Sequence, residues 1–326
     1  MKENKILMFL MGLTLSILMA GCANESSPNV NLSPMHSTSE ATSESTSEPK
    51  QSVVVSANED ILITSGGVYE VKGSYEEVSI IVDALETDAV EIVLNDVNII
   101  NTSKPAIYVK NAEAVTLTVN GSNGYLGTTS EFKTDGETNL DAVVFSKSDL
   151  ILAGNGTLKI VSTKGHAFVS KENLTIQGGT YMVEAASDGF QSDETLTVSA
   201  GTINIISCSE GLESTQVYIN GGDININASD DGINASQKSD RDMMIEINGG
   251  NLNIQMAAGD TDALDSNGTL TINGGTLNIS AMSAFDSDGP AVLNGGDITV
   301  NGEKVTEITQ MQMGPGSRQP GMMKRP

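Results

Sequence analysis

The chain has 326 residues, and its 17 Lys and Arg against 42 Asp and Glu give a formal net charge of −25. Such an excess of acid repels nucleic acid and anionic lipid surfaces, so neither is an expected partner. Hydrophobic residues make up 38% of the chain and are joined by 33 Gly, a composition that can build a core. With two Cys in all, a disulfide-stapled scaffold and a cysteine zinc site are not expected.

The first 22 residues have the pattern of a bacterial lipoprotein signal. Lys2 and Lys5 precede an apolar run over residues 6–20, which is short for a spanning helix and typical of a signal-peptide core. The run ends in Met19-Ala20-Gly21-Cys22, which resembles a lipobox apart from Met in the place of the usual Leu. We expect residues 1–21 to be removed and Cys22 to be acylated, so that a lipid anchor holds the protein on the extracellular face of the cell membrane. An ordinary secretory signal is the alternative.

Two further segments lack the pattern of folded structure. Residues 22–52 repeat Ser, Thr and Glu with few apolar side chains, which predicts a flexible tether after the lipidated Cys. Residues 306–326 are rich in Met, Gly and Pro without a strand or helix period, which predicts a disordered tail.

Between residues 53 and 305 the chain repeats short β-type segments and shows no helical pattern. Segments such as 174–176 and 196–198 alternate apolar and polar residues, so that one side of each strand faces inward. Small-residue turns, from Gly178-Gly179 to Gly295-Gly296, separate them at intervals of 21 to 28 residues. Stacked coils must restore the same residue types at each turn, about 4.8 Å apart, whereas sandwich hairpins need not. The repeat predicts an all-β right-handed parallel β-helix with about 22 residues per coil and roughly 11 coils.

The longer intervals between repeats predict loops that project from the coils. These loops are expected over residues 121–140, 237–242 and 256–261. Loops on a rigid scaffold often carry ligand contacts, so these three loops are candidate binding segments.

One corner of the predicted coil collects oxygen-bearing side chains. When the segments are aligned on their inward apolar residues, from Ile107 to Phe285, three positions around the bend carry acids in the later coils. Two carboxylates about 5 Å apart repel by roughly 3 kcal/mol at an effective dielectric near 20, and a bound cation removes that cost. Hard oxygen ligands without thiolates favour Ca²⁺ over Mg²⁺. The candidate ligands are Asp188, Asp193, Glu210, Glu213, Asp230, Asp231, Asp262, Asp265, Asp286 and Asp288.

The acidic corner has a simpler explanation as well. Asp-Gly and Asp-Ala are common turn formers on a solvated surface. That explanation accounts for acids before the bend, but not for acids at the two later positions.

The same column carries Lys110, Lys147 and Lys171 in the earlier coils. Stacked ammonium groups favour an anionic ligand such as a polymer of uronic acids. These lysines, with the rings of Tyr108 and Tyr181, are therefore the candidate carbohydrate contacts. Alternatively, each Lys neutralises a nearby acid such as Asp149 or Glu172. No Ser, His and Asp converge on a recognisable nucleophile motif.

Several segments carry a resemblance to a known family. They are KPAIYVKNAEAVTLTV (104–119), DAVVFSKSDL (141–150), GHAFVSKENLTIQGGT (165–180) and SDGFQSDETLTVSAGTINI (187–205). They closely resemble bacterial carbohydrate-binding domains of secreted and lipid-anchored proteins from anaerobic bacteria, and the resemblance covers residues 53–305. It implies a right-handed parallel β-helix like that of pectate lyases, calcium bound by corner aspartates, and binding of plant cell-wall pectin or cellulose without catalysis. The family's Asp-Gly corner matches Asp188-Gly189 and Asp231-Gly232, and matches Glu210-Gly211 and Asp262-Ala263 in part.

The sequence thus predicts a monomeric, non-catalytic, calcium-dependent carbohydrate-binding lipoprotein at the cell surface. Its expected partner is a polysaccharide such as polygalacturonate or cellulose, with the lipid anchor as its link to the membrane. One alternative is a calcium-dependent lyase of pectate type that uses Lys147, Lys171 or Lys238 as its base. Another is a structural adhesin whose repeats supply only a stiff scaffold.

Overall fold

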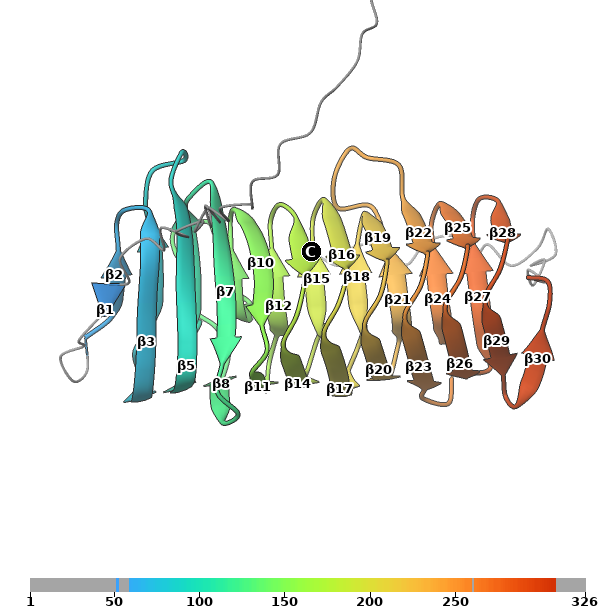
Figure 1. The fold of residues 1–326 in the computed structure, drawn as a ribbon, viewed down its shortest axis with the longest axis horizontal. Helices are drawn as coiled ribbons and strands as arrows, with labels where there is room; N and C mark the ends of the chain where they lie inside the picture. Colours follow the sequence, from blue (N-terminus) through green and yellow to red (C-terminus); the bar gives the residue numbers. More distant parts are fainter. Residues whose placement is uncertain (1–50, 53–58, 260, 309–326) are drawn as a thin grey trace, which may run out of the picture. The chain divides into compact units, whose positions relative to one another are not determined.

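The computed structural model describes residues 51–52, 59–259 and 261–308, and all regular structure in them is β (Figure 1). This confirms the all-β prediction. The expected signal segment with Cys22, most of the tether and the tail beyond residue 308 lie outside the described residues. In the described part of the chain, no helix is long and apolar enough to span a bilayer.

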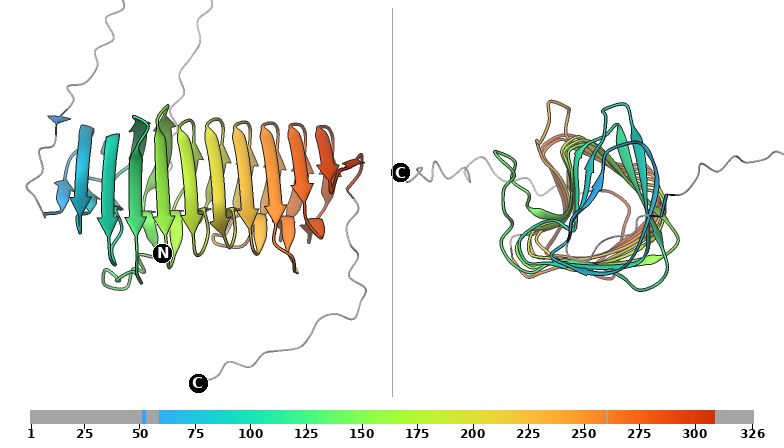
Figure 2. Two further views of the ribbon diagram at one scale, coloured as in Figure 1. Left: turned by 90° about the horizontal axis from the view of Figure 1, so that it is seen from below. Right: turned by 90° about the vertical axis from the view of Figure 1, so that its left-hand side faces the viewer.

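Each coil contributes strands to three rows that stack along a common axis and surround a triangular interior (Figure 2). Row 1 contains β2 (Ile61–Ile63), β4 (Ile80–Asp83), β6 (Ile107–Asn111), β9 (Ala142–Ser146), β12 (His166–Ser170), β15 (Phe190–Ser192), β18 (Leu212–Ser214), β21 (Asp231–Ala235), β24 (Asp262–Ser266) and β27 (Ser283–Ser287). Row 2 contains β7 (Ala114–Asn120), β10 (Asp149–Gly154), β13 (Leu174–Ile176), β16 (Thr195–Val198), β19 (Gln216–Ile219), β22 (Met244–Ile247), β25 (Thr269–Ile272) and β28 (Ala291–Leu293). Row 3 contains β8 (Gly124–Thr128), β11 (Thr157–Ser162), β14 (Thr180–Ala185), β17 (Thr202–Cys208), β20 (Asp223–Ala228), β23 (Asn251–Met256), β26 (Thr276–Ser280) and β29 (Asp297–Val300).

The two ends of the solenoid depart from this scheme. The long strands β3 (Gly67–Glu76) and β5 (Ala89–Asn101) run through both row 2 and row 3. The short strand β1 (Gln51–Ser52), which the sequence assigns to the tether, pairs with β3. At the other end, β30 (Glu303–Val305) pairs antiparallel with β29, whereas the other strand pairings in the described residues are parallel.

The predicted register of the coils is confirmed. In row 1, Phe168 pairs with Phe190, and Leu212 pairs with Ile233, as the alignment on inward apolar residues requires. The ten strands of row 1 in the described residues correspond to about ten coils, against the roughly 11 expected. The chain therefore forms a parallel β-solenoid.

Alternation of apolar and polar residues places one side of each strand in the core. Leu196, Val217 and Ile245 of successive coils are all fully buried and stack in register. The rings of Phe168 and Phe190 stack with centroids 4.8 Å apart. Stacking like on like thus fills the interior at every coil, which removes apolar surface from water along the whole length of the repeat.

The loops that the longer intervals predict are only partly as expected. Residues 237–242 lie between β21 and β22, and the segment 256–261 lies almost wholly between β23 and β24, as expected. The segment 121–140, however, contains β8, so its loop begins only after Thr128.

Candidate functional site

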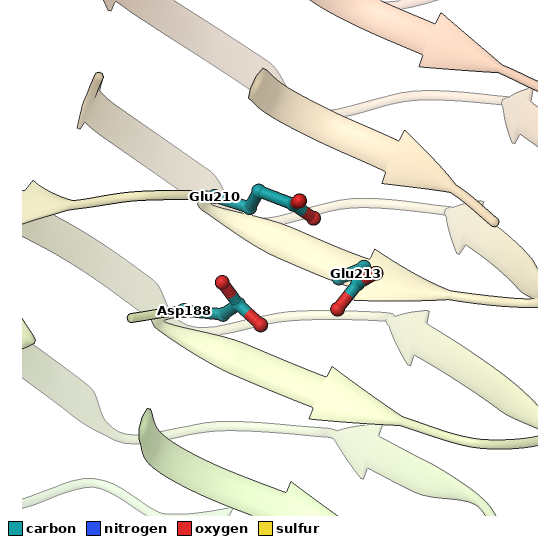
Figure 3. Close-up of side chains that lie close together, drawn as sticks. All are labelled: Asp188, Glu210 and Glu213. Carbon is teal, nitrogen blue, oxygen red and sulfur yellow. The ribbon is translucent and has the colours of Figure 1, made fainter. Parts of the chain in front are cut away.

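Three carboxylates from two adjacent coils meet beside row 1: those of Asp188, Glu210 and Glu213 (Figure 3). Each contributes one oxygen to a group in which all three atoms lie within 4.8 Å of one another. We call these residues the acidic trio. Asp188 precedes β15, Glu210 precedes β18, and Glu213 lies within β18.

Glycine in the chain allows the coils to approach closely at this corner. A Cβ atom at Gly211 would lie 2.4 Å from the carbonyl oxygen of Gly232 and 2.8 Å from the side chain of Ile226. Any side chain there would push adjacent coils apart. Glycine at this position therefore keeps the coil of Glu210 and Glu213 close to the following coil, which supplies Asn234.

Burial and mutual repulsion hold the trio in an unfavourable electrostatic state. Burial, followed by the charges of Glu213 and Asp188, raises the pKa of Glu210 to about 8. Burial also raises the pKa of Glu213, although Lys238 opposes the shift. Burial works against ionisation of Asp188 as well, but hydrogen bonding and attraction from His166 leave the pKa of Asp188 below its ordinary value. Positive charge near the trio would relieve this repulsion.

Neighbouring donors satisfy Glu213 and Asp188 better than Glu210. Lys238 Nζ lies 2.7 Å from Glu213 Oε1, and Gln191 Nε2 donates to Glu213 Oε2 at 3.1 Å. His166 Nδ1 lies 2.9 Å from Asp188 Oδ2 and 3.2 Å from the backbone nitrogen of Asp188. A protonated Nδ1 donates to the carboxylate, whereas a neutral Nδ1 accepts from the amide.

The side chain of Asn234 adds a fourth oxygen at this corner. Its Nδ2 donates to Glu210 Oε2 at 3.1 Å, while its buried Oδ1 accepts no hydrogen bond. A buried acceptor without a donor costs free energy unless something fills its lone pairs. Three carboxylates and a free amide oxygen, with no thiolate, form a donor set that fits Ca²⁺.

The remaining candidate ligands continue the acidic edge but do not close into a second trio within the described residues. Asp231 pairs in register with Asp262, and Asp265 with Asp286. Burial and neighbouring carboxylates raise the pKa of Asp231 to about 6 and that of Asp265 to about 7. Three other candidates lie apart from the trio. They are Asp193, which pairs with Lys171 at 3.3 Å, and the exposed Asp230 and Asp288.

Two of the three lysines of the earlier coils have acidic partners, although not the acids named from the sequence. Lys110 Nζ lies 3.3 Å from Asp135 Oδ2, and Lys171 Nζ lies 3.3 Å from Asp193 Oδ1. Lys147 lines a shallow hollow of about 430 Å³ together with Asp149 and Glu172. The proposed role of these lysines in carbohydrate binding remains a prediction.

The two tyrosines expected to contact carbohydrate do not present their rings to solvent, so this expectation is wrong. Tyr181 is fully buried in the core, where its ring packs edge-on against Phe168 and Phe190. Tyr108 is 4% exposed, and its hydroxyl donates to Asp135. Tyr181 faces inward because alternate residues of β14 point into the core, and Tyr181 lies on the same side of the strand as the buried Val183 and Ala185. Sequence alternation over so short a segment did not reveal which side faces the core.

Sequence reasoning missed the contribution of two amides, Gln191 and Asn234. Both occupy the column of Glu213, since Gln191 pairs with Glu213 and Glu213 pairs with Asn234. The signal was present in the alignment of coils. An amide in a column of acids supplies an oxygen ligand without adding charge.

The fold and the acidic corner define a parallel β-solenoid with an oxygen-rich edge. The chain belongs to the family of carbohydrate-binding domain-containing proteins, whose model matches residues 57–304. This confirms the resemblance found in the sequence. A carbohydrate-binding domain-containing protein of Acetivibrio thermocellus is 30% identical over 129 residues, which are 39% of this chain and 45% of that relative.

A solved structure shares the fold. It is described as the polysaccharide lyase-like protein from C. thermocellum, as a gadolinium derivative. It superposes with a TM-score of 0.51 at 22% identity and covers 76% of this chain and 87% of its own. At this identity the likeness shows the solenoid fold alone.

Proposed function

We propose that the protein is a non-catalytic carbohydrate-binding lipoprotein of the cell surface that holds Ca²⁺ at the acidic trio and binds an acidic polysaccharide there. Membership of the carbohydrate-binding family supports the polysaccharide partner. The observation that carries the proposal is the trio itself, in which three carboxylates lie within 4.8 Å of one another. Burial and the neighbouring carboxylates raise the pKa of Glu210 although the Asn234 amide donates to it, so a cation at this corner would stabilise its charge.

The proposed ligands of the ion come from three successive coils. Asp188 comes from one coil, Glu210 and Glu213 from the next, and Asn234 from the coil after that. Bound Ca²⁺ supplies positive charge to this corner and attracts anionic groups of a ligand. A polymer of uronic acids carries carboxylates at regular intervals, so it matches a cation on a solenoid edge. Acylation of Cys22 would keep this edge at the membrane surface.

Binding to immobilised polygalacturonate, with and without a chelator, tests this function. We expect retention in millimolar Ca²⁺ and release by chelator, because the ion links two sets of carboxylates. Glu210→Gln should weaken retention, whereas Glu172→Gln, at an exposed acid away from the trio, should not. If the protein is retained equally with and without chelator, the role of the cation is refuted. The absence of any retained polysaccharide would refute the function.

A calcium-dependent lyase is the second candidate, because one of the three lysines considered as its base, Lys238, forms an ion pair with the acidic trio. Lys171 pairs with Asp193 instead, and Lys147 lines a different hollow. Lys238 Nζ lies 2.7 Å from Glu213 Oε1, and the side chain is 19% exposed. In a lyase, Lys238 would take the proton next to the uronate carboxylate. The unsaturated product absorbs ultraviolet light, so incubation with polygalacturonate distinguishes the two functions. Growing absorbance that Lys238→Ala abolishes would favour the lyase.

A further inference from the structure

The outer surface of row 3 carries one continuous column of outward-facing residues, which shares no residue with the acidic trio. The coil-to-coil register joins them in a single line. In order along the axis they are Ser74, Asn98, Tyr125, Lys159, Met182, Asn204, Asn225, Asn253, Asn278 and Thr299. We call this column the row 3 track. The row can be followed in Figure 1 from β3 to β29.

One end of the track is a groove lined with amides. It encloses about 440 Å³ and is lined by Asn225, Asn253 and Asn278 together with Asn227, Gln255 and Thr299. The three track asparagines form a ladder in which the Nδ2 of each donates to the Oδ1 of the asparagine one coil before, at 2.9 to 3.1 Å. The ladder uses one N–H and one acceptor position of each interior amide, which leaves each with a second N–H and further acceptor capacity.

The other end of the track is a hollow with an aromatic wall. It encloses about 560 Å³, and its lining includes Tyr125, Asn98 and Ile100. The ring of Tyr125 lies over Gly127, where an added Cβ would come within 2.8 Å of a ring carbon. Glycine therefore lets this ring lie close against the strand, next to an Ile100 side chain that is 46% exposed. Rings and aliphatic groups of this kind pack against the C–H faces of sugars, and amides bind their hydroxyls.

Between the two hollows the track is amphipathic and almost uncharged. Lys159 is the only charged residue of the column, and its Nζ lies 2.8 Å from Glu184 Oε1. Met182 is 38% exposed and Ile206 beside the track is 44% exposed. This surface contrasts with the acidic edge of row 1 and with a chain whose net charge is −25.

We propose that the row 3 track is a second glycan site, which binds a neutral polysaccharide chain lying along the solenoid axis and needs no cation. Amides donate and accept at the same group, as sugar hydroxyls do, so they are matched to a neutral chain. An acidic chain gains nothing there, because the column offers one lysine that is already paired. The amides on four successive coils from Asn204 to Asn278, about 4.8 Å apart, favour a polymer over a single sugar. This site rests on the proposed carbohydrate-binding function but not on Ca²⁺.

Calorimetric titration of the full-length protein with a soluble neutral β-glucan, and separately with polygalacturonate, tests the proposal. We expect β-glucan to bind equally with and without chelator. Tyr125→Ala and Asn253→Asp should each weaken β-glucan binding about tenfold and leave polygalacturonate binding unchanged. The matched control is Asn248→Asp, because Asn248 lies in a similar ladder with Asn220 and Asn273 at the turns after row 2. That variant should bind β-glucan like the wild type.

The outcomes separate this site from the proposed function. Unchanged β-glucan binding in both track variants, or an equal loss in Asn248→Asp, would overturn the track. If the wild-type protein binds polygalacturonate but not β-glucan, the row 3 track is also overturned, whereas the proposed function stands. Binding of neither glycan would overturn both. If Asn253→Asp melts at a lower temperature than the control, its weaker binding could reflect lost stability. The test then relies on Tyr125→Ala, because the half-buried ring of Tyr125 lies outside the core.

Discussion

Glu210 links the acidic trio to the pH dependence of folding. Its pKa is raised to about 8 in the folded protein, mainly because it is buried and then because Glu213 and Asp188 are close. Glu in an unfolded chain ionises near pH 4.5. Between about pH 4.5 and pH 8, the folded state therefore holds a proton on Glu210 that the unfolded state has lost. The free energy of unfolding must therefore fall as the pH rises from about 4.5 to about 8. Asp231 and Asp265 act in the same direction.

Replacing Glu210 by Gln should stabilise the metal-free protein near pH 8 and remove its response to Ca²⁺. Gln keeps an oxygen for the Asn234 amide but carries no charge to repel Glu213 and Asp188. We expect a melting temperature about 2–4 °C higher in chelator, the shift that about 1 kcal/mol gives in a domain of this size. Scanning calorimetry in chelator and in millimolar Ca²⁺ measures both effects. A lower melting temperature in chelator, with the Ca²⁺ response intact, would show that the trio is not a cation site.

At the residue scale, the sequence was enough to find the acidic column but not the trio within it. The coil repeat alone placed Glu213 in the column where Asn234 and Asp265 follow. Which acids converge depends on side-chain length and on how closely glycine lets two coils approach, which periodicity does not encode. The partner of Glu213, Lys238, comes from a loop outside the repeat, so no alignment of coils predicts that contact.

At the scale of the strand, the site depends on Gly211, which lies between Glu210 and Leu212. Gly211→Ala should lower the melting temperature, because its Cβ would lie 2.4 Å from the Gly232 carbonyl oxygen of the next coil. Overpacking of this kind costs about 1–3 kcal/mol. The matched control is Ala167→Gly, which removes a methyl group from the same column two coils earlier and should cost about 1 kcal/mol or less.

Thermal unfolding of the two variants, followed by circular dichroism with and without Ca²⁺, checks this expectation. Gly211→Ala should also show a smaller Ca²⁺-induced rise than the control, since separating these two coils moves Glu210 and Glu213 away from Asn234. Equal melting temperatures for the two variants would mean that the coils yield at this corner without cost.

The strands themselves were predictable where apolar residues alternate, and less so where glycine interrupts them. Segments such as β13 and β16 repeat one pattern at a fixed interval, and they pair in register. Strand β8 contains Gly124 and Gly127, which read as turn residues, so the sequence placed it in a loop. The structure explains the difference, because Gly127 gives room to the ring of Tyr125 and Gly124 lies against Leu158 of the next coil.

At the scale of the whole solenoid, stacked parallel strands leave an open edge at each end, and such edges promote association between chains. At the C-terminal end β30 turns back and pairs antiparallel with β29. Val305 and Ile308 pack against the core, and Lys304 Nζ lies 2.9 Å from Asp297 Oδ1. A short antiparallel strand with a charged residue closes the edge in the manner of a capping repeat.

Removing this cap should therefore make the protein self-associate. A chain that ends at residue 300 lacks β30 and exposes the edge of β29 together with the apolar residues that Val305 and Ile308 cover. We expect it to form oligomers or aggregates that grow with concentration, whereas a control chain that ends at residue 308 retains the cap and the association state of the full chain. Light scattering coupled to gel filtration measures the mass of each. If the shorter chain keeps the mass of the control at every concentration, β30 is dispensable, and the last full coil must protect its own edge.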